Sequence, residues 1–214
     1  MKADWYFDFI SPFSYMQAER LASLPVEITC KPILFAGLLD HWGQKGPAEI
    51  GAKRRFTYRH VVWLAHKQDI PIKFPPAHPF NPLPLLRIAV ALGSRLDVIQ
   101  KIFRFVWRDG LLPDSNDNLA ALAKTLGVAG VDELNEFATK PDAKEGLRKN
   151  GEAAIARGVF GVPTLAIGGE LFWGFDATDM ALDFLRAQPL FDDAEMQRAG
   201  ELPYGAVRKA AAKP

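Results

Sequence analysis

Residues 5–14 of this 214-residue chain read Trp5-Tyr6-Phe7-Asp8-Phe9-Ile10-Ser11-Pro12-Phe13-Ser14. The aromatic run over positions 3–9 indicates a strand, and residues 14–24 have the spacing of an amphipathic helix. Pro25 ends that helix, and the alternating run over about residues 26–35 predicts a second strand. A strand–helix–strand unit this short predicts two parallel strands joined by a right-handed crossover.

A second informative segment, Val159-Phe160-Gly161-Val162-Pro163-Thr164, leads into a predicted hairpin. The hairpin strands cover residues 164–167 and 171–173, and Gly168-Gly169 between them is typical of a tight turn. The proline stands just before the first of these strands, where a sheet tolerates it. A last helix is predicted over about residues 177–187.

Between these segments the pattern is almost wholly helical, from Gly37 to about residue 155. A proline-rich, extended loop is expected over residues 71–84. Asn116 and Asp132 are the expected N-caps of two helices, and Gly127 is expected to stop the first of them. Helices are predicted over residues 48–67, 85–108, 116–126, 132–141 and 144–157.

This order of elements predicts an α/β fold, a thioredoxin-like βαβ…αββα core interrupted by a large helical insertion. The core is expected to comprise residues 1–36 and 156–190, and the insertion residues 37–155. Residues 191–214 form the remaining tail. From Arg198 the tail is rich in Ala and Lys, which predicts a mobile end or one packed on a partner.

Composition excludes several classes of function. The 26 basic and 25 acidic residues give a net charge of +1, so neither nucleic acid nor an anionic membrane is an expected partner. No stretch approaches the roughly 20 apolar residues of a membrane span. Asp4 and Asp8 interrupt any apolar run at the N-terminus, so no secretory signal is expected there. A cytoplasmic location follows as the expectation.

Cys30 is the only cysteine of the chain, which excludes dithiol redox chemistry of the C-x-x-C type. It lies in an alternating, strand-like run, so we expect a small apolar core residue and not a nucleophile. No metal site is expected.

Ser11 stands where the first strand ends and a helix begins. Free backbone N–H groups and the positive end of the helix dipole meet at such a point and favour an anion. A thiol with a reference pKa of about 8.5 becomes more acidic there by one to several units. Pro12 suits the first helical position, because its missing N–H would have no partner. The alternative is that Ser11 or Ser14 is only an N-cap.

Three blocks carry a resemblance to a known family: residues 7–15, 158–164 and 170–176. The chain resembles the 2-hydroxychromene-2-carboxylate isomerases, which belong to the kappa-class glutathione transferase group with a DsbA-like thioredoxin fold. Serines occupy the positions of the two redox cysteines. The resemblance extends to about residue 187 and includes shorter blocks at residues 46–49, 52–54 and 74–82.

The resemblance implies glutathione as cofactor. Ser11 would donate a hydrogen bond to its sulfur and favour the thiolate. Val162, before a cis proline, would pair through its backbone with the cysteinyl part. Residues 173–176, namely Trp173, Gly174, Phe175 and Asp176, would hold the γ-glutamyl end. Asp176 is either an N-cap or the carboxylate that receives the γ-glutamyl ammonium. Phe175 replaces a polar residue usual in the family, so any contact there must come from its backbone.

The insertion is expected to supply the substrate pocket. Lys53 and Arg54 are candidates to bind a carboxylate, with a solvated helix face as the alternative. His78 and Asn81 lie in the proline-fixed loop and are candidates to bond a phenol or carboxylate, although Asn81 before Pro82 also suits a plain turn. Trp42 and Trp63 are candidates to stack an aromatic substrate, although core packing is favoured for Trp63.

The family's reaction interconverts 2-hydroxychromene-2-carboxylate and trans-o-hydroxybenzylidenepyruvate by reversible thiolate addition, which is nucleophilic catalysis with a borrowed nucleophile. The resemblance therefore predicts a glutathione-dependent isomerase acting on a small aromatic substrate, with a homodimer as the assembly. Two alternatives stay open: a kappa-class-type glutathione transferase, and a non-catalytic module that binds glutathione or a peptide.

Overall fold

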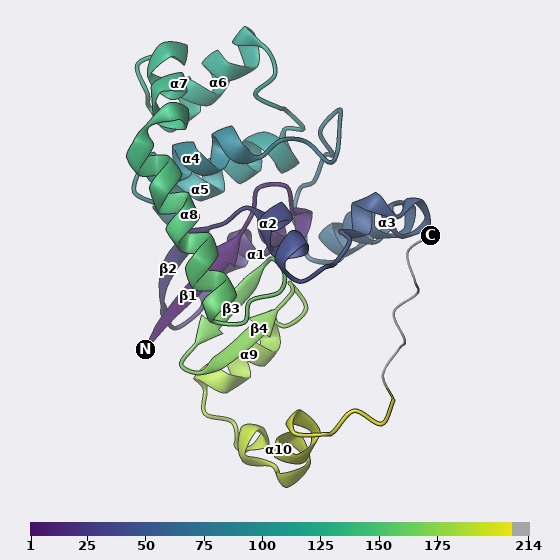
Figure 1. The fold of residues 1–214 in the computed structure, drawn as a ribbon. Coiled ribbons are helices and arrows are strands. Elements are labelled where there is room, and N and C mark those ends of the chain that lie inside the picture. Colours follow the sequence, from purple (N-terminus) through teal and green to yellow (C-terminus); the bar gives the residue numbers. More distant parts are fainter. Residues whose placement is uncertain (207–214) are drawn as a thin grey trace, which may run out of the picture.

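The computed structural model describes residues 1–206 and contains one mixed sheet of four strands (Figure 1). The strands are β1 (Lys2–Phe7), β2 (Glu27–Pro32), β3 (Thr164–Ile167) and β4 (Glu170–Trp173). Their order across the sheet is β2-β1-β3-β4, with β1 parallel to β2 and β3 antiparallel to both of its neighbours. The predicted strand–helix–strand unit and the predicted hairpin are both confirmed.

The helices follow the predicted order, so the βαβ…αββα core with a helical insertion is confirmed. The α-helices of the described residues are α1 (Pro12–Arg20), α2 (Phe35–His41), α3 (Gly51–Lys67), α4 (Leu83–Ala91), α5 (Leu96–Phe103), α6 (Asn116–Leu126), α7 (Val131–Thr139), α8 (Pro141–Ala156), α9 (Thr178–Leu185) and α10 (Ala194–Gly200). Short 3-10 turns are η1 (Leu21–Ser23), η2 (Pro47–Glu49) and η4 (Pro189–Asp192), and η3 (Arg104–Arg108) is a π-helical turn.

Strand β1 is buried on both faces because its side chains alternate between two cores. Trp5 and Phe7 stack 4.3 Å apart in the larger core, which includes residues of α1, the insertion helices and α9. Tyr6 points to the opposite face, into a smaller core that residues of α2 and α8 complete. The C-terminal end of β1 is thus held from both sides, and the Ser11 turn follows directly from it.

The prediction of one long helix over residues 85–108 is wrong, because α4 and α5 are separate helices. The chain breaks at Gly93 and Ser94, whose φ angles of +79° and +51° leave the helical region. The Ser94 N–H donates to the Ala89 carbonyl at 2.8 Å, which closes the end of α4. Apolar spacing continued across the break, so periodicity alone did not reveal it.

Other predicted boundaries move by a few residues. The second strand ends at Pro32, because Phe35 already begins α2. Ser115 and not Asn116 caps α6, whereas Gly127 stops that helix in the left-handed region as predicted. Asp132 lies inside the first turn of α7 and does not cap it.

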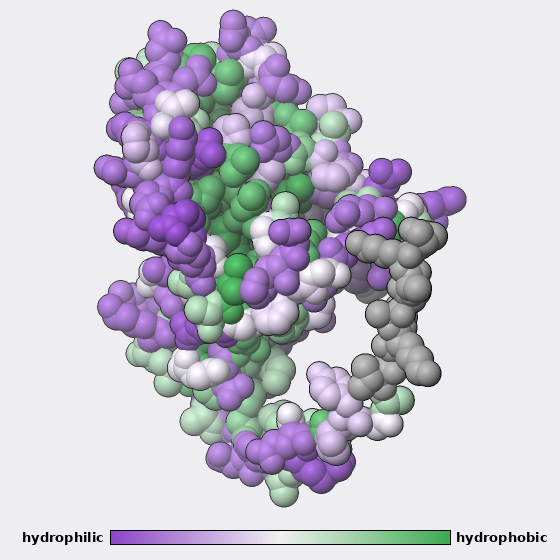
Figure 2. Space-filling model, in the orientation of Figure 1, coloured by the Kyte–Doolittle hydropathy of each residue, from purple (hydrophilic) through white to green (hydrophobic). Residues whose placement is uncertain are grey.

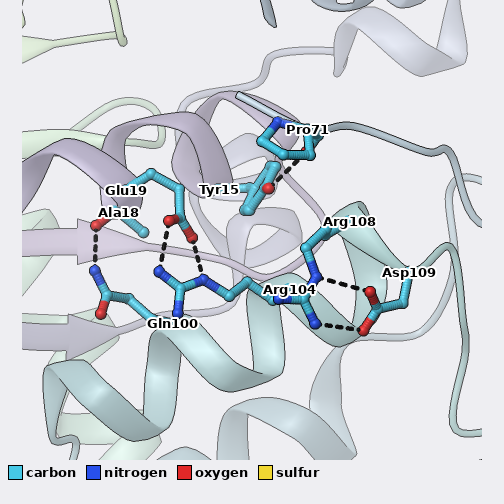
Figure 3. A network of polar contacts seen from close by, with 8 residues as sticks. All are labelled: Tyr15, Ala18, Glu19, Pro71, Gln100, Arg104, Arg108 and Asp109. Atoms are coloured by element: carbon cyan, nitrogen blue, oxygen red, sulfur yellow. Dashed lines mark hydrogen bonds and ion pairs between the residues drawn. The ribbon is translucent and has the colours of Figure 1, made fainter. Parts of the chain in front are cut away.

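Three contacts join α1 to the insertion and so hold the helix that begins at the Ser11 turn. Figure 3 draws them: the Tyr15 hydroxyl donates to the Pro71 carbonyl at 2.6 Å, Gln100 Nε2 to the Ala18 carbonyl at 2.8 Å, and the Arg104 guanidinium to both Glu19 oxygens at 2.8 and 2.6 Å. The last pair is bidentate, which fixes direction as well as distance.

An apolar groove lies on the opposite side, where α8 meets α2 and α4. Leu34, Leu38, Leu83, Leu147 and Ile155 are among the residues lining its volume of about 320 Å³. Figure 2 shows hydrophobic colour at the centre of this face. None of the predicted site residues lines the groove.

The tail continues as η4 and α10 after the core. Phe191 packs edge-on against Phe184 at 5.1 Å, which ties η4 to α9. Residues 207–214, to which part of the tail prediction applies, lie outside the described residues.

The predicted domain boundaries remain predictions; the first falls inside α2. In the part of the chain described, no helix is long and apolar enough to cross a bilayer.

Candidate active site

Ser11 is the N-cap of α1 and is 8% exposed. Its Oγ accepts the Ser14 N–H at 3.2 Å, and Pro12 occupies the first helical position. The N-cap interpretation is therefore confirmed, and it is compatible with anion binding. Because the oxygen accepts, its single hydrogen remains to be donated, and within residues 1–206 it has no acceptor.

One backbone donor of the same turn is also unused. No backbone or side-chain acceptor among the described residues takes the Phe13 N–H. The first turn of α1 has no acidic residue, so its positive end is not neutralised locally. The turn therefore offers a hydroxyl and a helix N-terminus to an anion of modest size.

The Val162–Pro163 peptide is cis, as expected, and lies beside this turn. The register pairs Tyr6 with Thr164, so the segment before β3 runs alongside the segment after β1. Val162 is 8% exposed. In residues 1–206 its backbone N–H and carbonyl make no hydrogen bond, which leaves them free for an extended ligand.

Residues 173–176 form the next part of the site. Trp173 is 54% exposed and lies across Gly161, where a methyl group would overlap the indole. Gly174 has a φ of +99°, and a methyl group on it would overlap the Asp176 carboxylate. The positive φ thus requires glycine at position 174, and the close approach of the indole favours it at position 161. Phe160 packs against the Trp173 ring at 5.1 Å and completes this wall.

Asp176 is exposed, and within the described residues its carboxylate has no partner. The N-cap interpretation of Asp176 is wrong, because Ala177 precedes α9 and no side chain caps that helix. Phe175 is 5% exposed and packs in the larger core. The buried side chain leaves the backbone of this residue for any ligand contact, as expected.

Gln17 holds these pieces together and was not found from the sequence. It is fully buried; its Oε1 accepts from Trp5 Nε1 at 2.8 Å, and its Nε2 donates to the Gly174 carbonyl at 3.1 Å and to Thr178 Oγ1 at 2.9 Å. These bonds fix the turn over residues 174–176 against α1. The available signal was a polar residue inside the apolar stripe of a short helix.

Replacing Gln17 with Leu should lower the free energy of unfolding by about 3 kcal/mol, because three buried polar groups lose their partner. Urea unfolding measures the change. Gln100→Leu is the matched control: it removes one half-buried bond to a carbonyl of α1, and about 1 kcal/mol is expected. Equal losses in the two variants would contradict a special role for Gln17.

The insertion residues lie at the start of α3 and in the proline-rich loop. Lys53 and Arg54 are exposed on the first turns of α3. Asn81 is exposed and its Oδ1 accepts the Leu83 N–H at 3.1 Å, so it makes the turn that was its alternative. The prediction that Trp63 packs in the core is wrong, since that side chain is 55% exposed. Trp42 is 43% exposed, and its indole N–H donates to the Val159 carbonyl.

His78 is half-buried, and both ring nitrogens have protein partners. Nε2 lies 2.8 Å from the Ile10 carbonyl oxygen and Nδ1 lies 2.5 Å from the Tyr58 hydroxyl. Burial lowers the pKa of His78; the bond to Ile10 opposes this, and the charge of Arg54 adds to it. Among the described residues, neither Lys53 nor Arg54 makes a hydrogen bond or ion pair with His78.

Two further titratable groups are buried in the core, Asp8 beside the turn and Cys30 on β2 opposite Trp5. Asp8 is fully buried, and its oxygens accept the N–H groups of Ile10 at 3.0 Å and Phe35 at 2.8 Å. Burial raises the pKa of Asp8 to about 7 despite these bonds. Cys30 is 6% exposed and belongs to the larger core, which confirms the predicted small core residue, and burial raises its pKa to about 12.

The arrangement suits an extended, peptide-like ligand with an anion at one point and an ammonium at its end. Ser11 and the α1 N-terminus would hold the anion, the Val162 backbone the middle, and Asp176 the ammonium. Among residues 1–206, no cluster of three or more His, Cys, Asp or Glu side chains has the geometry of a metal site.

Comparisons with known proteins agree with this geometry. A family model described as the DSBA-like thioredoxin domain matches residues 2–186. The 2-hydroxychromene-2-carboxylate isomerase of Pseudomonas putida is 31% identical over 184 residues, which cover 82% of this chain and 90% of that protein. Glutathione S-transferase kappa 2 of Caenorhabditis elegans is 26% identical over 86% of this chain and 91% of its own length. The solved selenomethionine 2-hydroxychromene-2-carboxylate isomerase superposes with a TM-score of 0.75 at 26% identity, covering 92% of this chain and 99% of that one.

Proposed function

The chain belongs to the DSBA-like thioredoxin family and is a relative of the 2-hydroxychromene-2-carboxylate isomerases, and from that premise we propose that it is a glutathione-dependent isomerase. Its substrate is 2-hydroxychromene-2-carboxylate, converted to trans-o-hydroxybenzylidenepyruvate, or a related intermediate of aromatic degradation. The observation that carries the proposal is Ser11, whose hydroxyl caps α1 while its hydrogen stays free for an external acceptor.

The residues fit glutathione in three places. Ser11 donates to the sulfur, the unpaired Val162 backbone pairs with the cysteinyl unit, and the unpartnered Asp176 receives the γ-glutamyl ammonium. Trp173 and Gly174 shape the wall beside that ammonium, and Phe175 contributes only backbone. The Ser11 hydrogen, the Val162 backbone groups and the Asp176 carboxylate have no other hydrogen-bond partner in the described chain.

In the reaction, bound glutathione would supply a thiolate that adds reversibly to a conjugated carbon and frees the neighbouring bond to rotate. Ser11 stabilises the charge on sulfur before addition and after release. Arg54 holds the substrate carboxylate, and Lys53 stabilises the developing enolate. The proline-rich loop carrying the half-buried His78 and the exposed Asn81 borders the space beside the sulfur and limits the entry of water.

Turnover of the chromene carboxylate should require glutathione, because the described chain has no reactive thiol of its own. Isomer formation is followed by ultraviolet absorbance with glutathione and, as the matched control, with S-methylglutathione, which has the same peptide but no free thiol. Activity without glutathione would refute the cofactor. Conjugation of an aryl halide without isomerisation would assign a transferase, and binding without either reaction would assign a non-catalytic module.

We also propose that the protein acts as a cytoplasmic homodimer. Helix α3 supports an interface, because Phe56 and Trp63 are 68% and 55% exposed on it. A molar mass in light scattering of twice the 23.7 kDa chain would support this assembly, and a single-chain mass would refute it.

A further inference from the structure

Two aromatic rings of the insertion donate to consecutive carbonyl groups just before Ser11. Trp107 Nε1 donates to the Phe9 carbonyl at 2.8 Å, and His78 Nε2 lies 2.8 Å from the Ile10 carbonyl oxygen. The two rings also pack against each other, 5.4 Å apart. The backbone leading to Ser11 is therefore held by side chains that lie about 70 to 100 residues further along the chain.

The partners of His78 define where its protons are. A carbonyl oxygen can only accept, so Nε2 must carry a hydrogen. In the neutral ring Nδ1 is then an acceptor and takes the hydroxyl hydrogen of Tyr58, 2.5 Å away. The same hydroxyl also donates to the His78 backbone carbonyl at 2.9 Å, so its one hydrogen is shared between the ring and the backbone of that residue. The Ile10 carbonyl thus sets the tautomer, and Tyr58 holds the orientation of the ring.

The bond from His78 acts on Ser11 through a single rigid unit. The Ile10 carbonyl and the Ser11 N–H belong to one planar peptide. That N–H donates to the carbonyl of Asp8, the residue after β1, at 3.1 Å, so the plane is held on both sides, by His78 and by Asp8. Losing the His78 bond would free one side of the plane, and its rotation would move Ser11 away from its cap position.

We propose that Tyr58 and His78 are positioning residues, which orient the Ile10–Ser11 peptide and thereby the hydrogen bond from Ser11 to the bound sulfur. The inference rests on the proposed function for its sulfur acceptor, but its structural part does not. It gives His78 a role distinct from binding substrate, since both ring nitrogens are already engaged. It also links α3, through Tyr58, to the reactivity of the thiol site.

The test combines two readouts on Tyr58→Phe, which deletes only the phenol oxygen. The amide resonance of Ser11 in the free protein should shift, which requires no glutathione. With glutathione bound, the thiol pKa should rise by about half a unit and kcat should fall about fivefold with little change in KM for the substrate. His78→Ala should lower kcat further, by about tenfold, and His78→Gln, which keeps an N–H donor, should recover part of that kcat.

Tyr15→Phe is the matched control, because it also removes a phenol that donates to a backbone carbonyl, at Pro71. It loosens α1 but leaves both bonds of the Ile10–Ser11 peptide in place, so the Ser11 resonance should shift less than in Tyr58→Phe and the thiol pKa should stay unchanged. An unshifted Ser11 amide in both Tyr58→Phe and His78→Ala would overturn the inference. If the Ser11 amide shifts in these variants but the wild-type protein does not acidify glutathione, the proposed function would be overturned and the positioning role would stay supported.

Discussion

Replacing Ser11 with Ala is expected to raise the pKa of bound glutathione by one to two units, roughly, and to lower kcat/KM by about 10- to 100-fold. The reason is the loss of a hydrogen bond to a charged sulfur, which contributes about 1.5–3 kcal/mol. The helix N-terminus remains in the variant, so some acidification of the thiol should persist. Thiolate absorbance titrated against pH measures the first effect, and isomerase kinetics measure the second.

Stability must be separated from chemistry, because Ser11 also caps α1. Ser115→Ala provides the control: Ser115 caps α6 by accepting the Asn118 N–H at 3.2 Å, the same length as the Ser11–Ser14 bond. Each variant should lose about 1 kcal/mol of unfolding free energy. Only Ser11→Ala should change the titration midpoint of the thiol. A midpoint that stays at the wild-type value would defeat the assignment of Ser11.

Features set by neighbouring residues could be predicted from the sequence. The turn from β1 into α1 follows from the aromatic run and Pro12, and the β3–β4 hairpin follows from Gly168-Gly169. The Ser11 cap is also local, since its bond spans three residues. The family resemblance supplied the expected cis peptide at Pro163, which local sequence alone does not determine.

Features set by distant residues could not be predicted in this way. Gln17 bonds across 157 residues to Gly174, and His78 bonds across 68 residues to Ile10. Both side chains are polar groups whose burial becomes visible only when the insertion and the core pack together. The helix break at Gly93 was not predicted for the opposite reason: a local turn interrupts an apolar stripe that continues on both sides.

Asp8 provides the prediction with the largest effect on stability. Its pKa is raised by burial to about 7 in the folded protein, whereas an unfolded chain has a value of about 3.9. Between these values the folded state binds more protons, so the free energy of unfolding falls as pH rises. The contribution is fully present below pH 4 and is lost as pH passes 7, by about 4 kcal/mol in all.

Asp8→Asn should remove this pH dependence of the free energy of unfolding, but should lower that free energy by the same amount at every pH. The amide keeps one acceptor for the N–H groups of Ile10 and Phe35 and cannot serve both, which costs about 2 kcal/mol at every pH. The variant should therefore be less stable than the wild type at pH 4 and more stable at pH 8, so that the two curves cross between these values. Urea unfolding across that range measures both curves.

Asp4→Asn is the control, because Asp4 lies on β1, which ends just before Asp8 in the chain, but is half-exposed and paired with Arg157 at 2.8 Å. That variant should keep the wild-type fall in stability between pH 4 and 8. Parallel curves for Asp8→Asn and the wild type would mean that Asp8 does not titrate in this range. A crossing would show that the turn leading to Ser11 is built on a carboxyl group that the fold stabilises in its neutral form, and that ionising it weakens the same backbone that positions Ser11.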